Sequence, residues 1–206
     1  MSTLGSGATA TRPGDGTLVS QEEYRRLSLA DDNGVWELNE GRPREIPGLS
    51  VQHGSLMFEL GFALRPQLNR AVYAVRVGYA RLRRTAENYY VPDVAIVPTH
   101  LERVSLRQPG SLDAYAEPLP LVLEIWSPST GHYDTETKIA AYQARGDEEI
   151  WRLHPLDRTL RVWRRRLNGG YDETFYQAGQ VPVASLPGVV VIDLDRLFAA
   201  EAPSLE

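Results

Sequence analysis

The chain has 206 residues, of which 42% are hydrophobic and 24% are charged, and its formal net charge at pH 7 is -5. This composition is typical of a folded globular protein and excludes extended disorder or a fibrous architecture. The absence of cysteine excludes disulfides, thiolate zinc sites and cysteine nucleophiles, and it suits a reducing, cytoplasmic setting. The acidic balance disfavours a protein that coats nucleic acid nonspecifically.

We expect one domain between two tails. Residues 1–17 are small and polar and cannot bury enough apolar surface to become ordered, and residues 201–206 are expected to form a short C-terminal tail. Residues 18–200 are long enough for a single domain with a real core. No apolar run approaches the roughly 20 residues that a membrane span requires, so we expect a cytoplasmic protein that does not contact a membrane.

Helix and strand signals alternate in the first hundred residues. Ser20 with Glu23 forms a capping box, which predicts a short helix beginning there. The spacing of apolar residues predicts a long helix over residues 50–70, which Pro66 is expected to kink or to end early. Segments rich in β-branched and aromatic residues predict a hairpin at 35–46 and antiparallel strands at 71–83 and 89–97.

The second half of the chain predicts a buried central strand. Residues 98–118 are rich in Pro, Gly and Ser and predict a loop that carries a short helix or a flap. Residues 120–126 form an apolar run typical of a buried strand, which Glu124 interrupts. A helix is predicted over 135–147. Further strands are predicted at 148–155, 159–166 and 169–177, and residues 188–198 predict a strand that turns into a short helix. This order predicts an α/β protein with a mixed central sheet flanked by helices.

Two carboxylates in otherwise apolar strands, Asp93 and Glu124, are followed by Lys138 on the next predicted helix. Desolvating an unpaired carboxylate is costly, so two such strands indicate one shared site. Mg²⁺, or Mn²⁺ as a substitute, takes oxygen ligands from one or two carboxylates and keeps several waters, which leaves room for a phosphate. Metal-assisted cleavage of phosphodiester bonds is therefore the leading hypothesis, with both carboxylates as metal ligands.

The pair Pro92-Asp93 followed by Glu124 resembles the PD-(D/E)xK nuclease pattern, in which a lysine stands two residues after the glutamate. This chain has Trp126 at that position and offers Lys138 one helix further on. Several separated segments, together covering most of residues 20 to 200, resemble the Uma-two family of bacterial endonucleases, in which the lysine is displaced to the helix. The matching segments are residues 36–41, 91–97, 121–130, 134–142 and 148–155, with His53 at the start of a helix.

This resemblance implies a restriction-endonuclease-like fold, Mg²⁺-dependent cleavage of nucleic acid, most simply DNA, and a homodimer. It implies that Asp93 and Glu124 hold the metal and that Lys138 orients the attacking water or offsets charge. Glu37 and His53 suit a supporting role, the first reaching the metal through water and the second touching a phosphate near a helix N-terminus.

Each candidate also has a simpler interpretation. Asp93 suits a turn after proline, Glu124 suits an ion pair with an arginine, and Lys138 suits a local pair with Asp134 or Glu136. A rival function is a noncatalytic dimeric module that binds nucleic acid or protein, with Trp126 marking a lost lysine. RNA and branched DNA stay open as substrates. Two arginine clusters suit either backbone binding or protection of exposed strand edges, and they comprise Arg81, Arg83, Arg84, Arg161, Arg164, Arg165 and Arg166.

Overall fold

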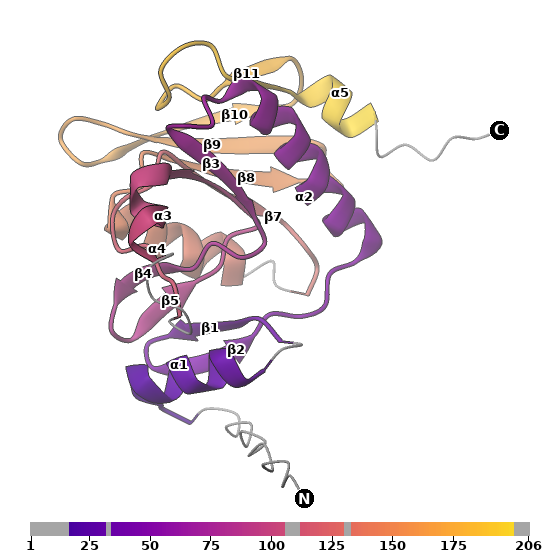
Figure 1. Cartoon of the computed structure of the whole chain (residues 1–206). Helices are drawn as coiled ribbons and strands as arrows, with labels where there is room; N and C mark the ends of the chain where they lie inside the picture. The colour runs from indigo at the N-terminus through magenta and orange to yellow at the C-terminus, as the bar shows by residue number, and fades with distance from the viewer. Residues whose placement is uncertain (1–16, 32–33, 106–111, 130–132, 200–206) are drawn as a thin grey trace, which may run out of the picture.

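The computed structural model describes residues 17–31, 34–105, 112–129 and 133–199, and two β-sheets form its frame (Figure 1). The four-stranded sheet has the order β2 (Arg42–Glu45), β1 (Trp36–Asn39), β5 (Asn88–Tyr90), β4 (Leu82–Thr85). The six-stranded sheet has the order β10 (Tyr171–Tyr176), β9 (Thr159–Arg165), β8 (Glu149–His154), β7 (Leu121–Ile125), β6 (Val94–Pro98), β3 (Tyr73–Val77). A separate small sheet pairs β11 (Gln180–Pro182) with β12 (Val191–Asp193).

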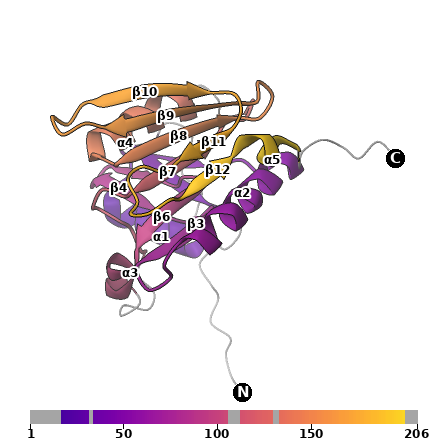
Figure 2. The same cartoon turned by 90° about the horizontal axis from the view of Figure 1, so that it is seen from above.

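The six-stranded sheet is mixed, because β7 and β8 run parallel while its other neighbouring strands run antiparallel. Helices lie on both of its faces, with α2 and α5 on one side and α4 on the other (Figures 1 and 2). The helices are α1 (Gln21–Ala30), α2 (Val51–Leu64), α3 (Thr99–Ser105), α4 (Ile139–Arg145) and α5 (Leu194–Ala199). The predicted α/β class with a mixed central sheet flanked by helices is confirmed.

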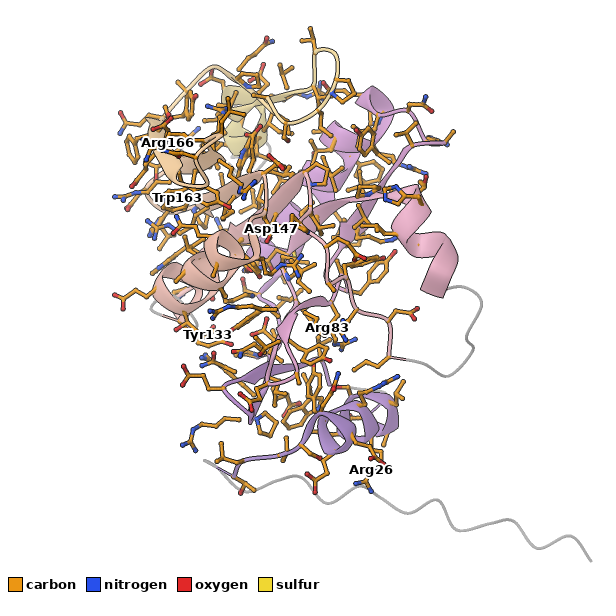
Figure 3. The ribbon with its side chains drawn as sticks, turned by 90° about the vertical axis from the view of Figure 1, so that its left-hand side faces the viewer. Arg26, Arg83, Tyr133, Asp147, Trp163 and Arg166 are labelled. Carbon is orange, nitrogen blue, oxygen red and sulfur yellow. The ribbon has the colours of Figure 1, made fainter. Side chains whose placement is uncertain are left out.

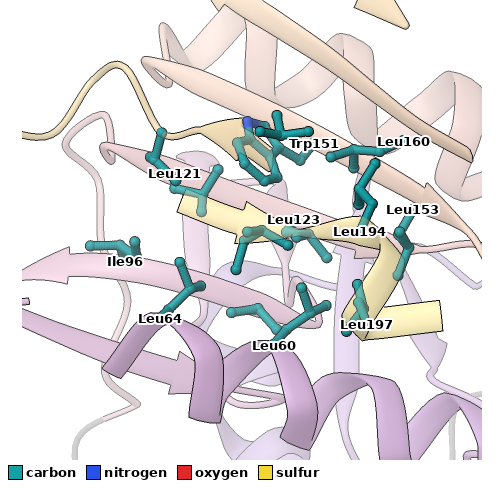
Figure 4. Close-up of a cluster of buried hydrophobic side chains, with 14 of the residues drawn as sticks. Leu60, Leu64, Ile96, Leu121, Leu123, Trp151, Leu153, Leu160, Leu194 and Leu197 are labelled. Carbon is teal, nitrogen blue, oxygen red and sulfur yellow. The ribbon is translucent and has the colours of Figure 1, made fainter. Parts of the chain in front are cut away.

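The main core lies between the six-stranded sheet and α2 (Figure 4). Leu60 and Leu64 of α2 belong to the same buried cluster as Leu121 and Leu123 of β7. Successive side chains of a strand point to opposite faces, so the residues of β7 that alternate with these leucines face α4 instead. Glu124 is one of them, and this alternation places its carboxylate on the α4 side of a strand that is buried along its whole length.

Local signals at helix ends behave as the sequence predicts. The capping box of Ser20 and Glu23 is present at the start of α1. The long helix predicted over residues 50–70 ends at Leu64 and continues as one 3₁₀ turn, η1 (Arg65–Gln67), which contains Pro66. Gly146 follows α4 in the left-handed conformation, with φ 85°, which a residue without Cβ adopts at little cost.

The C-terminal end of α4 is fixed to the sheets by a buried ion pair. Arg145 Nε donates to Asp147 Oδ2 over 3.0 Å, and the guanidinium also donates to the Tyr115 and Glu117 carbonyls. Asp147 Oδ1 accepts from the Leu119 N–H over 2.7 Å. Burial raises the pKa of Asp147, and Arg145 opposes that rise. These contacts hold α4 in place, and the segment before α4 supplies the lysine described below.

Two strand predictions need correction. The strand predicted over residues 89–97 is two strands, because β5 ends at Tyr90 and β6 begins at Val94 in the other sheet. Pro92 lacks an N–H donor and restricts the residue before it, so the ladder cannot continue through this point. Asp93 therefore lies immediately before a strand and not within one. The strand predicted over 71–83 is similarly divided, at Gly78, whose φ is 74°.

Other expectations have mixed outcomes. The loop predicted over residues 98–118 carries α3, and residues 106–111 lie outside the described part of the chain. Strand β11 was not predicted. The tails expected at 1–17 and 201–206 lie outside the described residues except for residue 17, so the predicted domain limits stay a prediction. Among the described helices, none is long and apolar enough to cross a membrane.

Candidate active site

A pocket of about 580 Å³ opens where the four-stranded sheet meets the six-stranded sheet and the start of α2. All five candidate residues from the sequence line it, although they come from different elements and are up to 101 positions apart (residues 37 to 138). Its lining includes Glu37, Arg44, His53, Asp93, Glu124, Ser127, Tyr133 and Lys138. The structure therefore brings the predicted residues together in one place, and their chemical roles stay predictions.

The antiparallel pairing of β6 with β7 places Asp93 beside Glu124. Val94 is the partner of Leu123, and one further step in the same register sets residue 93 against residue 124. Asp93 Oδ2 accepts a hydrogen bond of 2.7 Å from the N–H of Ile125, which fixes the carboxylate against the end of β7. The two carboxylates thus lie on one wall of the pocket, as the sequence predicts for a shared site.

Lys138 connects this wall to the other sheet. Its Nζ lies 2.8 Å from Glu124 Oε1 and 3.0 Å from Glu37 Oε1, and it donates over 3.0 Å to the Val91 carbonyl. Three acceptors match the three donors of an ammonium group. Lys138 is 3% exposed and both glutamates are 1% exposed, so this is a buried cluster of charges and not a surface ion pair.

The backbone before α4 is wound to deliver this lysine. Residues Tyr133–Lys138 form a π-helical segment, η2, that runs directly into α4, where a regular helical turn was predicted. A π-helical turn holds more residues than an α-helical turn, and such segments are rare in proteins and frequently occur at functional sites. The local winding sets the direction in which Lys138 leaves the helix.

Glu37 supports the site in a different way from the one predicted. Its Oε1 accepts a hydrogen bond of 2.7 Å from the N–H of Val91, in addition to its contact with Lys138. Glu37 therefore ties β1 to the short linker that carries Asp93. The prediction that it reaches a metal through water stays untested, while its direct role in holding Lys138 and the linker is visible.

His53 also differs from its expected contact. The backbone N–H of His53 donates to the Oγ of the N-cap residue Ser50 over 3.2 Å, which places His53 in the first turn of α2. Its Nε2 lies 2.9 Å from Asp93 Oδ1. The ring thus holds the second carboxylate oxygen of Asp93. Because both oxygens of Asp93 have partners, its carboxylate is fixed in one orientation toward the pocket.

Three side chains at the site were not assigned to it from the sequence. The hydroxyl of Tyr142 donates to Glu124 Oε1 over 2.5 Å. Tyr142 is four residues after Lys138, so the spacing i, i+4 was a usable signal that both reach the same strand. Tyr133 lines the pocket, and burial, with Glu37 nearby, raises the pKa of its hydroxyl. The third, Arg44, is the register partner of Glu37.

A compositional signal was also missed. The sequence contains 22 Lys and Arg residues, and Lys138 is the only lysine among them. Lysine carries a compact charge with three rotatable donors, which a planar guanidinium does not reproduce. A chain that uses arginine at every other basic position and lysine at this one marks residue 138 as chemically distinct.

The contacts of these residues extend beyond the simpler interpretations. Glu124 pairs with Lys138, and Lys138 also contacts Glu37, so it joins β7 to β1. Trp126, at the usual lysine position, stacks on His154 with ring centroids 4.2 Å apart. In the arginine clusters, Arg161 pairs with Glu173 and Arg164 with the buried Glu149.

The donor set at the site fits a hard divalent ion with a water-rich shell. Within the described residues, no group of three or more His, Cys, Asp or Glu side chains is arranged to hold a metal. Asp93 and Glu124 offer two carboxylates, and Mg²⁺ is commonly bound through one or two carboxylates with the remaining positions filled by water and phosphate. Zinc, which prefers nitrogen and sulfur ligands in a closed set, fits this arrangement poorly.

Known proteins agree with the architecture. One solved structure, described as a putative nuclease belonging to DUF820 from Anabaena variabilis, matches with a TM-score of 0.65 and 17% sequence identity. The match covers 88% of this chain and 98% of the other, and it shows a shared fold. None of the curated proteins matches this sequence significantly. A family model described as "Putative restriction endonuclease" matches residues 21–195. The chain belongs to this family, Uma2.

Proposed function

We propose that this protein is a metal-dependent endonuclease that hydrolyses phosphodiester bonds of DNA in the cytoplasm. The observation that carries this proposal is the placement of the only lysine between Glu124 and Glu37, in the pocket where Asp93 lies. Family membership and the shared fold support nuclease chemistry at a coarser level. The finer statement, including the metal and the substrate, rests on the residues of the pocket.

Asp93 and Glu124 would hold Mg²⁺, and the ion would polarise the phosphate and lower the pKa of a bound water. The chain's own groups prepare the site for this. His53 and the Ile125 N–H fix both oxygens of Asp93. Tyr142 and Lys138 both contact Oε1 of Glu124, and a carboxylate has further lone pairs for another ligand.

Lys138 would act on the reacting groups from between the two glutamates. An ammonium held there offsets negative charge that develops on a phosphate and orients a water by hydrogen bonding. Glu37 is then a positioning residue, because it holds Lys138 and the linker at Val91. Lys138, Glu37 and Glu124 are all buried, so the electrostatic interactions among them are stronger than they would be in water.

The direct test is cleavage by the purified full chain. We expect it to convert supercoiled plasmid to nicked or linear DNA with Mg²⁺ or Mn²⁺, and to lose this activity in EDTA. A second readout does not depend on turnover: protein labelled with ¹³C-lysine contains one labelled side chain, and its signal is expected to shift on titration with Mg²⁺. A protein that cleaves equally well in EDTA would contradict a metal-dependent mechanism.

Parallel reactions with RNA and with branched DNA decide the substrate class. If the protein cleaves RNA or branched DNA in preference to plasmid, that nucleic acid is the substrate and not duplex DNA, and the assignment of the site residues is unchanged. Binding of nucleic acid without cleavage of any of the three, with each metal, would favour the noncatalytic module.

We also propose that the protein forms a homodimer through α2. The outward side of this helix exposes Val51 (89%), Phe58 (65%) and Phe62 (72%), which are spaced 7 and 4 residues apart. This is the spacing of a helix–helix seam, and Gly54 on the same side has nothing within 4 Å of where a Cβ would stand. A second copy of α2 would cover these rings.

The double variant Phe58→Ser/Phe62→Ser is expected to sediment as a monomer while the wild type sediments as a dimer, because the paired apolar surface is lost. Leu167→Ser is the control, since this leucine is fully exposed between β9 and β10. A monomeric wild type at micromolar concentration, measured by analytical ultracentrifugation, would refute the dimer.

A further inference from the structure

Lys138, His53 and Arg44 are basic side chains that line the pocket, and two of them already face carboxylates. Lys138 lies between Glu37 and Glu124, and His53 contacts Asp93. Arg44 forms no ion pair with any residue that the structure describes. Its guanidinium carbon instead lies 3.9 Å from the centroid of the Tyr133 ring. Within the part of the chain that the structure describes, Arg44 is thus a cation of the pocket lining without an ion-pair partner.

The position of Arg44 is set by both of its neighbours. It lies on β2 opposite Glu37 on β1, and register partners in an antiparallel pair project to the same face. The side chain is half-buried and stacks on Tyr133, which belongs to η2, the segment that also carries Lys138. Stacking on an aromatic face orients a guanidinium while its N–H donors project from the edge of the plane.

An anionic ligand would complete this arrangement. A cation that is removed from water without a counter-charge is unfavourable, and a guanidinium edge matches the oxygens of a phosphate in a bidentate way. The adjoining wall of the pocket carries the carboxylates that would hold a metal, so a phosphate near Arg44 would stand next to the reacting centre.

We propose that Arg44 binds a backbone phosphate of the nucleic-acid substrate in this pocket. The proposal deepens the nuclease function and rests on it for the identity of the ligand. The competing explanation is that Arg44 only packs against Tyr133 and holds η2 in place. The two explanations differ in what happens to phosphate binding when the charge is altered and the packing is kept.

The experiment measures binding in EDTA, so that it is independent of cleavage. Fluorescence anisotropy of a fluorescein-labelled oligonucleotide is followed for the wild type, Arg44→Ala and Arg44→Lys, with inorganic phosphate as a competitor. Arg26→Ala is the charge-matched control, because Arg26 lies on α1, away from Tyr133 (Figure 3). Circular dichroism melts verify that each variant is folded.

Arg44→Ala is expected to weaken binding by about 10-fold or more, as for loss of a charge-assisted hydrogen-bonding pair. The slope of log K against log salt concentration is expected to fall by about one, because one phosphate contact is lost. Arg44→Lys is expected to keep the salt slope with intermediate affinity. Arg26→Ala is expected to bind as the wild type does.

Two results would overturn the proposal: a folded Arg44→Ala protein that binds with unchanged affinity and salt slope, or a wild type that does not bind the oligonucleotide at all. If Arg44→Ala unfolds, Arg44→Lys provides the test. A folded Arg44→Lys protein that has lost the salt-dependent contact would contradict the proposal, because a lysine keeps the positive charge. Failure of the nuclease function looks different. In that case the wild type binds, Arg44→Ala binds weakly, and no metal supports cleavage.

Discussion

Glu124→Gln and Asp93→Asn are each expected to reduce metal-dependent cleavage by about 10³-fold or more, because each removes one of the two carboxylates available to the metal. Both changes keep the shape of the side chain. The glutamine oxygen of Glu124→Gln can still accept from Lys138 and Tyr142, and the asparagine oxygen of Asp93→Asn can still accept from the Ile125 N–H. Single-turnover cleavage of a labelled oligonucleotide measures the rate, and a thermal melt verifies the fold.

The control for these variants is Glu59→Gln. Glu59 is exposed on α2, the helix that also carries His53, so the change in net charge is the same while the pocket is untouched. We expect wild-type cleavage from Glu59→Gln. Cleavage that persists in folded Asp93→Asn and Glu124→Gln proteins would show that the reaction takes place elsewhere, and it would also remove the basis for reading Lys138 as a reacting group.

Lys138→Met is expected to lower the free energy of unfolding by about 3–5 kcal/mol, the usual cost of removing one partner from a buried ion pair. Without the ammonium group, Glu37 and Glu124 stay buried and lose a charged partner, while the Val91 N–H and the Tyr142 hydroxyl still donate to them. The methionine side chain fills most of the same volume, so the loss reports charge more than packing. Urea denaturation followed by circular dichroism gives the change in unfolding free energy at constant slope.

A combined variant tests the cause of this loss. Adding Glu37→Gln and Glu124→Gln to Lys138→Met neutralises both carboxylates, and we expect most of the lost stability to return. A loss below about 1 kcal/mol for Lys138→Met alone, the range of exposed ion pairs, would mean that solvent reaches this cluster and that its electrostatic role is weak. Cleavage is expected to be lost in either case, since both roles of Lys138 require its ammonium group.

Much of the fold was predictable because its signals are local. The capping box before α1, the apolar spacing of α2 and the glycine after α4 each act within a few residues. The apolar run of β7 identifies a buried strand wherever that strand lies in the sheet, and Glu124 within it is costly in any fold unless it is paired. These features explain why Asp93, Glu124 and Lys138 were selected as candidates.

The division of strands depended on sheet assignment, which no local pattern contains. Residues around Tyr90 and Val94 have equally strong strand signals, yet β5 and β6 belong to different sheets. The break at Pro92 places Asp93 at the junction of the two sheets, where the pocket opens. Pro92 is visible in the sequence, but nothing near it shows that the strands before and after it belong to different sheets.

The sequence by itself determined which residues carry unusual chemistry: two acids among apolar residues, and one lysine in a chain that otherwise uses arginine. Only the tertiary structure decided how they are paired. Lys138 faces Glu37 from β1, His53 faces Asp93, and Arg44 stacks on Tyr133. The physical reason is that side chains distant in sequence meet only after sheets and helices pack, and the energy of a buried charge depends on those partners.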